Sequence, residues 1–138
     1  MEDLNLTSPV KTKSRRVCLL DDDPSVVKAT SRLLSSAGWK VESFTDPIEF
    51  LRHARTCELE VVVLDISMPS MSGLEVQKRL RHISPSSRAV VLTSKDDPSV
   101  RAEAMQSGAA AFFVKPVDDE EFLAGIESAF SRNGTSDS

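Results

Sequence analysis

Residues 61–73 read VVVLDISMPSMSG, an apolar run that passes into a loop. The first residues of this run are mostly β-branched, which predicts a short strand that is buried on both faces. The run ends at Asp65, and Pro69 and Gly73 mark the loop that follows. A single carboxylate is therefore expected where a buried strand meets solvent. An Asp in this position most often ends a strand and hydrogen-bonds its own loop, so the role of Asp65 depends on the rest of the chain.

The same order of a short apolar strand and an amphipathic helix recurs along the chain. Strands are predicted at 16–20, 39–44, 61–65, 89–93 and 110–114, and helices at 24–37, 47–54, 72–83, 98–107 and 118–132. Because parallel neighbours need right-handed crossovers, these units imply a parallel sheet with helices on both faces. No Gly-rich turn follows the first strand, which removes the dinucleotide-binding order. We therefore predict an α/β, flavodoxin-like, doubly wound five-stranded sheet with strand order 2-1-3-4-5.

The length of 138 residues suffices for one domain and is too short for two ordinary ones. We expect that domain at 16–132, with a flexible leader at 1–15 and a disordered tail at 133–138. The hydrophobic and charged fractions, 40% and 28%, are typical of a soluble globular protein. No apolar run approaches the ~20 residues that a membrane span needs, and no secretory segment is visible, so a cytoplasmic protein without membrane contact is expected.

The net charge of −4 argues against direct contact with nucleic acid, because neutralising phosphates requires a clustered basic surface. Lys11, Lys13, Arg15 and Arg16 form a basic cluster before the first strand. A solvated leader explains this cluster better than a nucleic-acid arm does.

Cys18 and Cys57 show neither metal spacing nor a disulfide framework, so plain thiols are expected. His53 and His82 are isolated in their predicted helices, and we expect both at the surface.

Polar side chains stand at the carboxyl ends of four predicted strands. Asp21 and Asp22 follow the first strand, Asp65 ends the third, Thr93 ends the fourth, and Lys115 follows the fifth. In a doubly wound sheet, ligands bind outside these ends, at the switch point between the first and third strands. We therefore expect these five side chains to converge on one crevice.

Three adjacent carboxylates repel one another unless a cation lies among them. Oxygen ligands without His or Cys suit Mg²⁺ or Mn²⁺ rather than Zn²⁺, with a backbone carbonyl and waters completing the octahedron. A hard cation beside a carboxylate, a hydroxyl and an ammonium suits phosphoryl transfer. Asp65 is the candidate nucleophile because it follows the central strand, whereas Asp21 and Asp22 are better placed to hold metal. Lys115 and Thr93 can interact with the phosphoryl oxygens.

These motifs resemble those of the receiver domains of two-component response regulators. The matching segments are LDDDP at 20–24, LDISMPSMSG at 64–73, LTS at 92–94 and FFVKP at 112–116. The resemblance runs from about 16 to 132 and implies the CheY-like version of the fold. It implies that Asp65 accepts a phosphoryl group from the phosphohistidine of a sensor histidine kinase. Such a domain is not an enzyme in the ordinary sense, because it catalyses only its own phosphoryl transfer and dephosphorylation.

The resemblance also implies a ligand set for the metal. Asp22, Asp65 and the backbone carbonyl of Ser67 would bind Mg²⁺ directly, and Asp21 would hold it through water. Mn²⁺ can substitute for Mg²⁺ in such a site.

Thr93 and Lys115 would contact the phosphoryl group, and Phe112 would match the aromatic switch of the family. Phosphorylation would draw the Thr93 hydroxyl toward the crevice and let Phe112 rotate inward. We expect this change to favour a homodimer through the face formed by 97–107, 110–114 and 118–132.

Segments 44–51 and 115–118 look most like receivers that precede a helix-turn-helix output domain, so the switch would control an output such as transcription. A stand-alone receiver and a shortened chain both remain open.

Two other functions compete with a phosphorylation switch. An aspartyl-phosphate phosphatase acting on small molecules would carry an Asp-x-Asp motif, whereas Asp65 is followed by Ile66 and Ser67. An interaction module that keeps only the fold would be expected to lose one or more of the residues at Asp22, Asp65, Thr93 and Lys115, and all of them are present.

Overall fold

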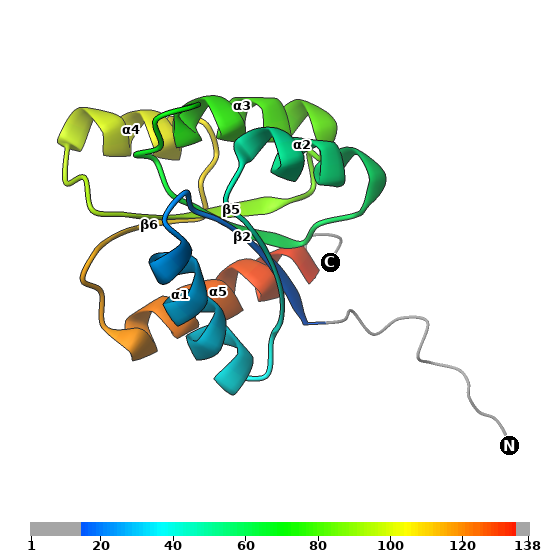
Figure 1. Cartoon of the computed structure of the whole chain (residues 1–138), viewed down its shortest axis with the longest axis vertical. Coiled ribbons are helices and arrows are strands. Elements are labelled where there is room, and N and C mark those ends of the chain that lie inside the picture. The colour runs from blue at the N-terminus through cyan, green and yellow to red at the C-terminus, as the bar shows by residue number, and fades with distance from the viewer. Residues whose placement is uncertain (1–14, 135–138) are drawn as a thin grey trace, which may run out of the picture.

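The computed structural model describes residues 15–134, which form one parallel sheet with helices on both faces (Figure 1). In chain order the elements are β2 (Arg16–Leu20), α1 (Pro24–Ser36), β3 (Lys40–Phe44), α2 (Pro47–Thr56), β4 (Val61–Leu64), α3 (Gly73–Ile83), β5 (Arg88–Thr93), α4 (Pro98–Gln106), β6 (Ala111–Val114) and α5 (Asp119–Gly134). Helix α5 thus includes positions 133 and 134, which were expected in the tail. Of the leader expected at 1–15 and the tail expected at 133–138, positions 1–14 and 135–138 lie outside the described residues.

The strands lie side by side in the order β3-β2-β4-β5-β6, and every neighbouring pair is parallel. Numbered from the first strand, this order is 2-1-3-4-5, so the predicted topology is confirmed. Leu20 at the end of β2 pairs with Leu64 at the end of β4. The two chains therefore leave the sheet next to each other, and the acidic residues that follow them enter the same space.

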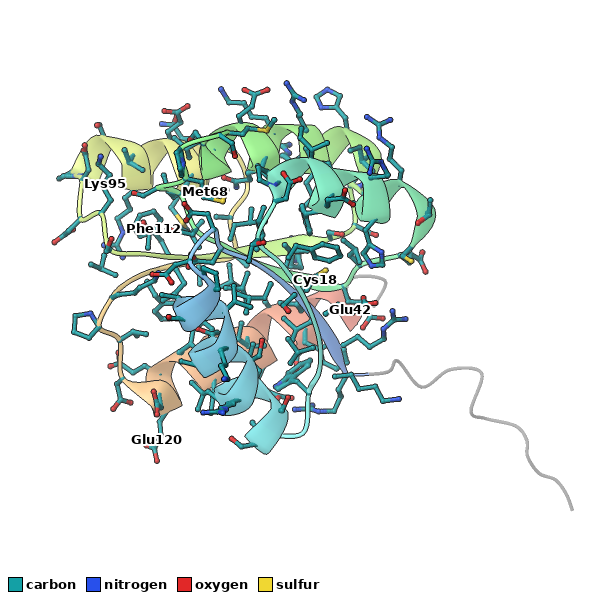
Figure 2. The ribbon with its side chains drawn as sticks, in the orientation of Figure 1. Cys18, Glu42, Met68, Lys95, Phe112 and Glu120 are labelled. Atoms are coloured by element: carbon teal, nitrogen blue, oxygen red, sulfur yellow. The ribbon has the colours of Figure 1, made fainter. Side chains whose placement is uncertain are left out.

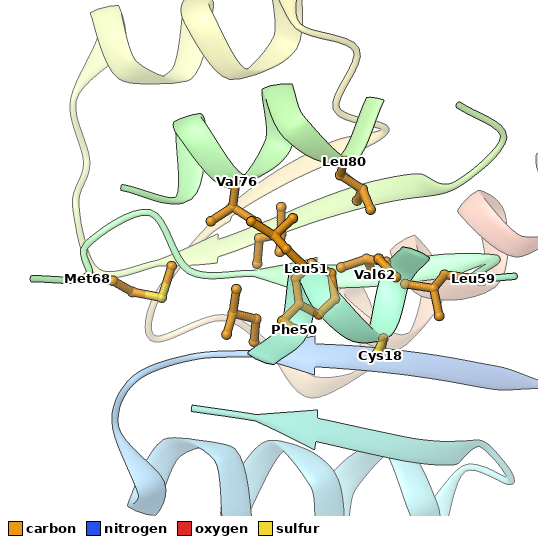
Figure 3. Packing of buried hydrophobic residues seen from close by; sticks show 12 residues of the cluster. Cys18, Phe50, Leu51, Leu59, Val62, Met68, Val76 and Leu80 are labelled. Carbon is orange, nitrogen blue, oxygen red and sulfur yellow. The ribbon is translucent and has the colours of Figure 1, made fainter. Parts of the chain in front are cut away.

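The core forms two layers because successive residues of a strand point to opposite faces of the sheet. Val61 and Val63 of β4 pack with residues of α1 and α5, while Val62 and Leu64 pack with residues of α2 and α3. Figure 1 shows α2, α3 and α4 on one face and α1 and α5 on the other, and Figure 3 shows the layer beneath α2 and α3. All four β4 side chains are at most 1% exposed, and burial of each contributes about 1.5–3 kcal/mol before entropy is counted.

Aspartate side chains begin the helices at the crevice side of the sheet. Asp23, Asp46 and Asp97 each accept a hydrogen bond from the backbone N–H two residues later, and Pro occupies the first helical position after each. Asp118 accepts from the N–H of Glu121 at the start of α5. Within residues 15–134, no helix combines the length and the apolar composition that a bilayer crossing requires.

Candidate functional site

Three carboxylates converge at the carboxyl edge of the sheet. Asp21 and Asp22 follow β2, and Asp65 follows β4. One oxygen from each lies within 4.8 Å of the others. Asp21 is 3% exposed and Asp65 is 6% exposed, while Asp22 is half-buried. An acidic pocket of this kind can bind a cation, since three neighbouring carboxylates repel one another unless positive charge lies among them.

Lys115 provides a positive charge on the other side of the cluster. Its Nζ donates to Asp21 Oδ2 at 3.0 Å, and Asp21 Oδ1 accepts the N–H of Asp23 at 3.0 Å. The backbone N–H of Lys115 donates to the carbonyl of Thr93 at 2.8 Å, which holds the chain after β6 beside the end of β5. Both oxygens of Asp21 are therefore engaged by protein donors.

Asp65 has a raised pKa, first because it is buried and second because the Asp21 carboxylate lies close to it. Lys115, the Ser67 N–H and the Thr93 hydroxyl act in the opposite direction. The Ser67 N–H donates to Asp65 Oδ1 at 3.2 Å, whereas the Ser67 side chain is exposed. The carboxylate is thus held in place while its charge remains only partly compensated.

Gly73 is part of the site for a reason that the sequence analysis did not recognise. It is the first residue of α3, and its N–H donates to the carbonyl of Ile66 at 3.0 Å. A Cβ at this position would lie 2.8 Å from the Ile66 Cα and would collide with the carbonyl oxygen of Asp65. The start of α3 can therefore approach the backbone beneath the Asp65 carboxylate only without a side chain. The sequence feature that could have indicated this close approach is the Gly directly after Ser72, the residue that caps α3.

Thr93 joins the site, whereas Phe112 lies behind it. Thr93 is fully buried, its hydroxyl counteracts the raised pKa of Asp65, and its Oγ1 accepts the N–H of Lys95 at 3.2 Å. The Phe112 ring is 6% exposed and packs in a cluster with Val91 and Ala104, among others, beneath α4.

The Phe112 ring already lies inside in this structure, and its rotation after phosphorylation stays a prediction. The Arg101 guanidinium covers the ring, with its Cζ 5.3 Å from the ring centroid. Figure 2 labels Phe112 and the exposed Lys95 on the side of the sheet near α4. The five residues predicted to converge do so, and the aromatic residue contacts this group only through the packing around it.

The chain is similar to known proteins over most of its length. The family model described as "Response regulator receiver domain" matches residues 17–127. "Response regulator protein TodT" of Pseudomonas putida is 34% identical over 113 residues, which are 82% of this chain and 50% of that protein. "Transcriptional regulatory protein FixJ" of Azorhizobium caulinodans is 33% identical over 121 residues, which are 88% of this chain and 57% of that protein. The chain spans about half the length of the curated relatives it matches.

A solved structure shows the same similarity in three dimensions. The solution structure of the beryllofluoride-activated NtrC4 receiver domain dimer aligns with a TM-score of 0.82 and 28% sequence identity. The alignment covers 86% of this chain and 98% of that chain. The similarity therefore extends over nearly the whole length of an isolated receiver domain.

Proposed function

The chain belongs to the family of response regulator receiver domains, and from this membership we propose that Asp65 is its phosphoryl acceptor and a sensor histidine kinase its donor. Members of this family act in two-component signalling as phosphoryl acceptors. The observation that supports Asp65 is the convergence of Asp21, Asp22 and Asp65 within 4.8 Å, with Lys115 bonded to Asp21 at 3.0 Å. Asp65 follows β4, the central strand of the sheet, and unlike Asp21 it is not bonded to Lys115, which favours it as the nucleophile.

The proposed transfer forms one bond and breaks one. An Asp65 carboxylate oxygen attacks the phosphorus of the kinase phosphohistidine, an O–P bond forms, and the P–N bond breaks. The electron pair of the broken bond returns to the imidazole, which takes up a proton from solvent. Lys115 Nζ and the Thr93 hydroxyl are the protein donors best placed to bind the oxygens of the arriving group. Burial of Asp65 limits the water that competes for the acyl phosphate.

Mg²⁺ is the cation that we propose for the acidic cluster, and Mn²⁺ is its substitute. The donor atoms are carboxylate oxygens, which suit a hard divalent ion. Asp22 and Asp65 are proposed as direct ligands together with the Ser67 carbonyl. Asp21 is proposed to act through water, because both of its oxygens already accept protein hydrogen bonds. When bound, the ion supplies positive charge that offsets the charge of the transferred phosphoryl group.

The acceptor assignment is tested by incubating the chain with a small phosphodonor and Mg²⁺, followed by intact-mass measurement and peptide mapping. One phosphoryl group should appear on Asp65, labile to base, and Asp65→Asn should lose it. Asp97→Asn is the matched control, because Asp97 caps α4 outside the cluster and its loss should leave the modification unchanged. Phosphate recovered on Ser67, on Thr93 or on a histidine would refute the assignment.

The output is proposed to be transcription, through a homodimer formed by the α4, β6 and α5 face. One relative is named a transcriptional regulatory protein, and one similar structure is an activated receiver dimer. A phosphoryl group on Asp65 would bind the Thr93 hydroxyl and thereby alter the packing next to Phe112. Because the ring is already buried, phosphorylation would stabilise an arrangement that the free chain can adopt, as expected of a population shift.

Sedimentation with and without a phosphoryl mimic tests this route. Wild type should dimerise with the mimic, and Thr93→Ala should bind the mimic without dimerising. Ser94→Ala is the control, since Ser94 is the exposed neighbour of Thr93. Equal dimerisation of wild type and Thr93→Ala would show that Thr93 does not transmit the signal.

A further inference from the structure

A second cluster of metal-ligating side chains lies at the edge of the sheet formed by β2 and β3. Cys18 on β2 pairs in register with Glu42 on β3. Side chains paired in this way on neighbouring strands project from the same face of a sheet, and Cys18 lies in the core layer under α2 and α3. Figure 2 labels the two residues on these neighbouring strands, and Figure 3 shows Cys18 within the core layer.

Helix α2 brings two further ligand groups to this face. His53 and Cys57 are four residues apart, a spacing that places them on one side of the helix end. His53 Nε2 lies 3.2 Å from Glu42 Oε1, and His53 Nδ1 lies 3.8 Å from Cys57 Sγ. The Phe44 ring packs against the imidazole, with 5.1 Å between the centroids.

The expectation that His53 is an isolated surface residue was therefore wrong. The residue is half-buried, and it contacts Glu42 on β3 and Cys57 at the end of its own helix. The register of the strands and the packing of the helix do not appear as a linear motif. The spacing of positions 18, 42, 53 and 57 in the sequence therefore did not predict that these residues cluster.

We propose that Cys18, Glu42 and His53 bind a Zn²⁺ ion, with Cys57 accepting the Nδ1–H of His53 and orienting its ring. One ligand atom from each of the three lies within 4.8 Å of the others. In tetrahedral zinc sites, bonds of about 2.0–2.3 Å separate the ligand atoms by about 3–4 Å, so only a small closure is needed. A water molecule would complete the four ligands, and Cys57 would act as the outer partner that metal-bound histidines require.

The charges of the three ligands would balance the charge of Zn²⁺ at this partly buried site. A thiolate and a carboxylate offset the two charges of Zn²⁺, and a neutral imidazole adds none, so the occupied site carries no net charge. Removing a neutral site from water costs far less than burying an isolated ion. Cys18 is 2% exposed, and its burial raises the pKa of the thiol to about 12, so the ion must displace a tightly held proton.

Arg16 is the group that competes with the ion. Its guanidinium lies 3.3 Å from Glu42 Oε1, so Glu42 would exchange this exposed ion pair for the metal. The ion has a route of entry on the same side, because the Glu42 and His53 side chains are 40% and 21% exposed. The site is also chemically distinct from the acidic cluster, whose ligands are all oxygen and select a harder ion.

The test uses the full chain under a non-thiol reductant, with Mg²⁺ in excess to occupy the acidic cluster and Co²⁺ as the spectroscopic probe for the zinc site. One equivalent of Co²⁺ should produce strong near-ultraviolet absorption from thiolate-to-cobalt charge transfer, and Zn²⁺ should remove it by displacement. Absence of this absorption at one equivalent would overturn the proposal.

Three variants and one control distinguish the proposed roles of Cys18, His53 and Cys57 in zinc binding. Cys18→Ala should lose the charge-transfer absorption, and His53→Gln should weaken Zn²⁺ binding at least about tenfold. Cys57→Ser should keep the absorption and bind Zn²⁺ more weakly, by about tenfold, because only the orientation of His53 changes. His82→Gln is the control, since His82 is exposed on α3 and should leave binding unchanged.

Mn²⁺ binding at the acidic cluster reports whether Cys18→Ala is folded. If that variant does not fold, His53→Gln decides, because His53 is only half-buried, and undiminished Zn²⁺ binding in His53→Gln would overturn the proposal. Loss of the absorption in Cys57→Ser would also overturn it, because the thiolate ligand would then be Cys57.

Discussion

Replacing Gly73 by Ala should damage the acidic site through backbone packing alone. The added Cβ would lie 2.8 Å from the Ile66 Cα, whereas ordinary contact begins at 3.4 Å, so the backbones must separate by at least 0.6 Å. The backbone of Asp65 and Ile66 resists this movement: the Asp65 N–H donates to the carbonyl of Leu20 at 3.1 Å, and the Ile66 carbonyl accepts the N–H groups of Met68 and Gly73.

The expected cost follows from two opposing effects. Overpacking of this kind costs about 1–3 kcal/mol, while Ala gains up to about 1 kcal/mol over Gly within a helix. A net loss of about 1–2 kcal/mol should lower the Tm by about 4–8 °C. Because the displaced backbone supports the Asp65 carboxylate, Mn²⁺ affinity should fall about tenfold as well.

Thermal melts and Mn²⁺ titration followed by electron paramagnetic resonance measure the two effects. Gly108→Ala is the matched control, since Gly108 has a φ of +98° but no close neighbour for a Cβ. An Ala forced into that conformation costs about 1–2 kcal/mol, a similar loss of stability far from the site. Gly108→Ala should therefore melt earlier with unchanged Mn²⁺ affinity. If Gly73→Ala also kept its Mn²⁺ affinity, or kept its Tm, the packing argument would be refuted.

Three further changes should have measurable consequences. With divalent ions removed, wild type should gain stability relative to Asp65→Asn as the pH falls from about 7 to about 4 in urea melts. Because the pKa of Asp65 is raised in the folded chain, its carboxylate is protonated at a higher pH there than in the unfolded chain. The stability gained from this protonation is complete below the ordinary pKa of Asp and is lost as the pH rises through the raised pKa. Parallel stability profiles of wild type and Asp65→Asn against pH would contradict this. Lys115→Met should lower the free energy of unfolding of the metal-free chain by about 1–2 kcal/mol in urea melts, because it leaves the buried Asp21 carboxylate without its ion-pair partner. Added Mg²⁺ should reduce this loss. An unchanged urea midpoint of the metal-free variant would contradict the prediction. Arg15→Ala should cost about 1 kcal/mol in thermal melts, since its guanidinium lies 4.2 Å from the centroid of the Trp39 ring. A loss no larger than that caused by replacing the exposed Lys28 of α1 with Ala would contradict it.

The local chemistry of the chain was sufficient to predict the fold and the main residues of the acidic site. Apolar runs ending in Asp21, Asp65 and Thr93 predicted where strands end, and the carboxyl ends of parallel strands necessarily meet at one edge. Asp-Pro pairs predicted helix starts at Asp46 and Asp97. These features depend on neighbours in the sequence, so the sequence of one chain is enough to predict them.

Contacts between segments that are distant in the sequence depend on how the helices pack on the sheet, and no local sequence pattern encodes how close those segments come. The Phe112 ring is buried in this structure because α4 and Arg101 cover it, although its sequence position is equally compatible with an outward ring. The need for Gly73 is set by the distance between the start of α3 and the backbone of residues 65 and 66.

The cluster of Cys18, Glu42 and His53 is the clearest case. Its members are far apart in the chain, and none of the intervals between them matches a metal-binding motif. The parallel register of β2 and β3 places Cys18 beside Glu42, and the packing of α2 on that face brings His53 to both. Periodicity shows which face of a strand or helix is buried, but which buried faces meet, and in what register, is decided by the packing of the whole core.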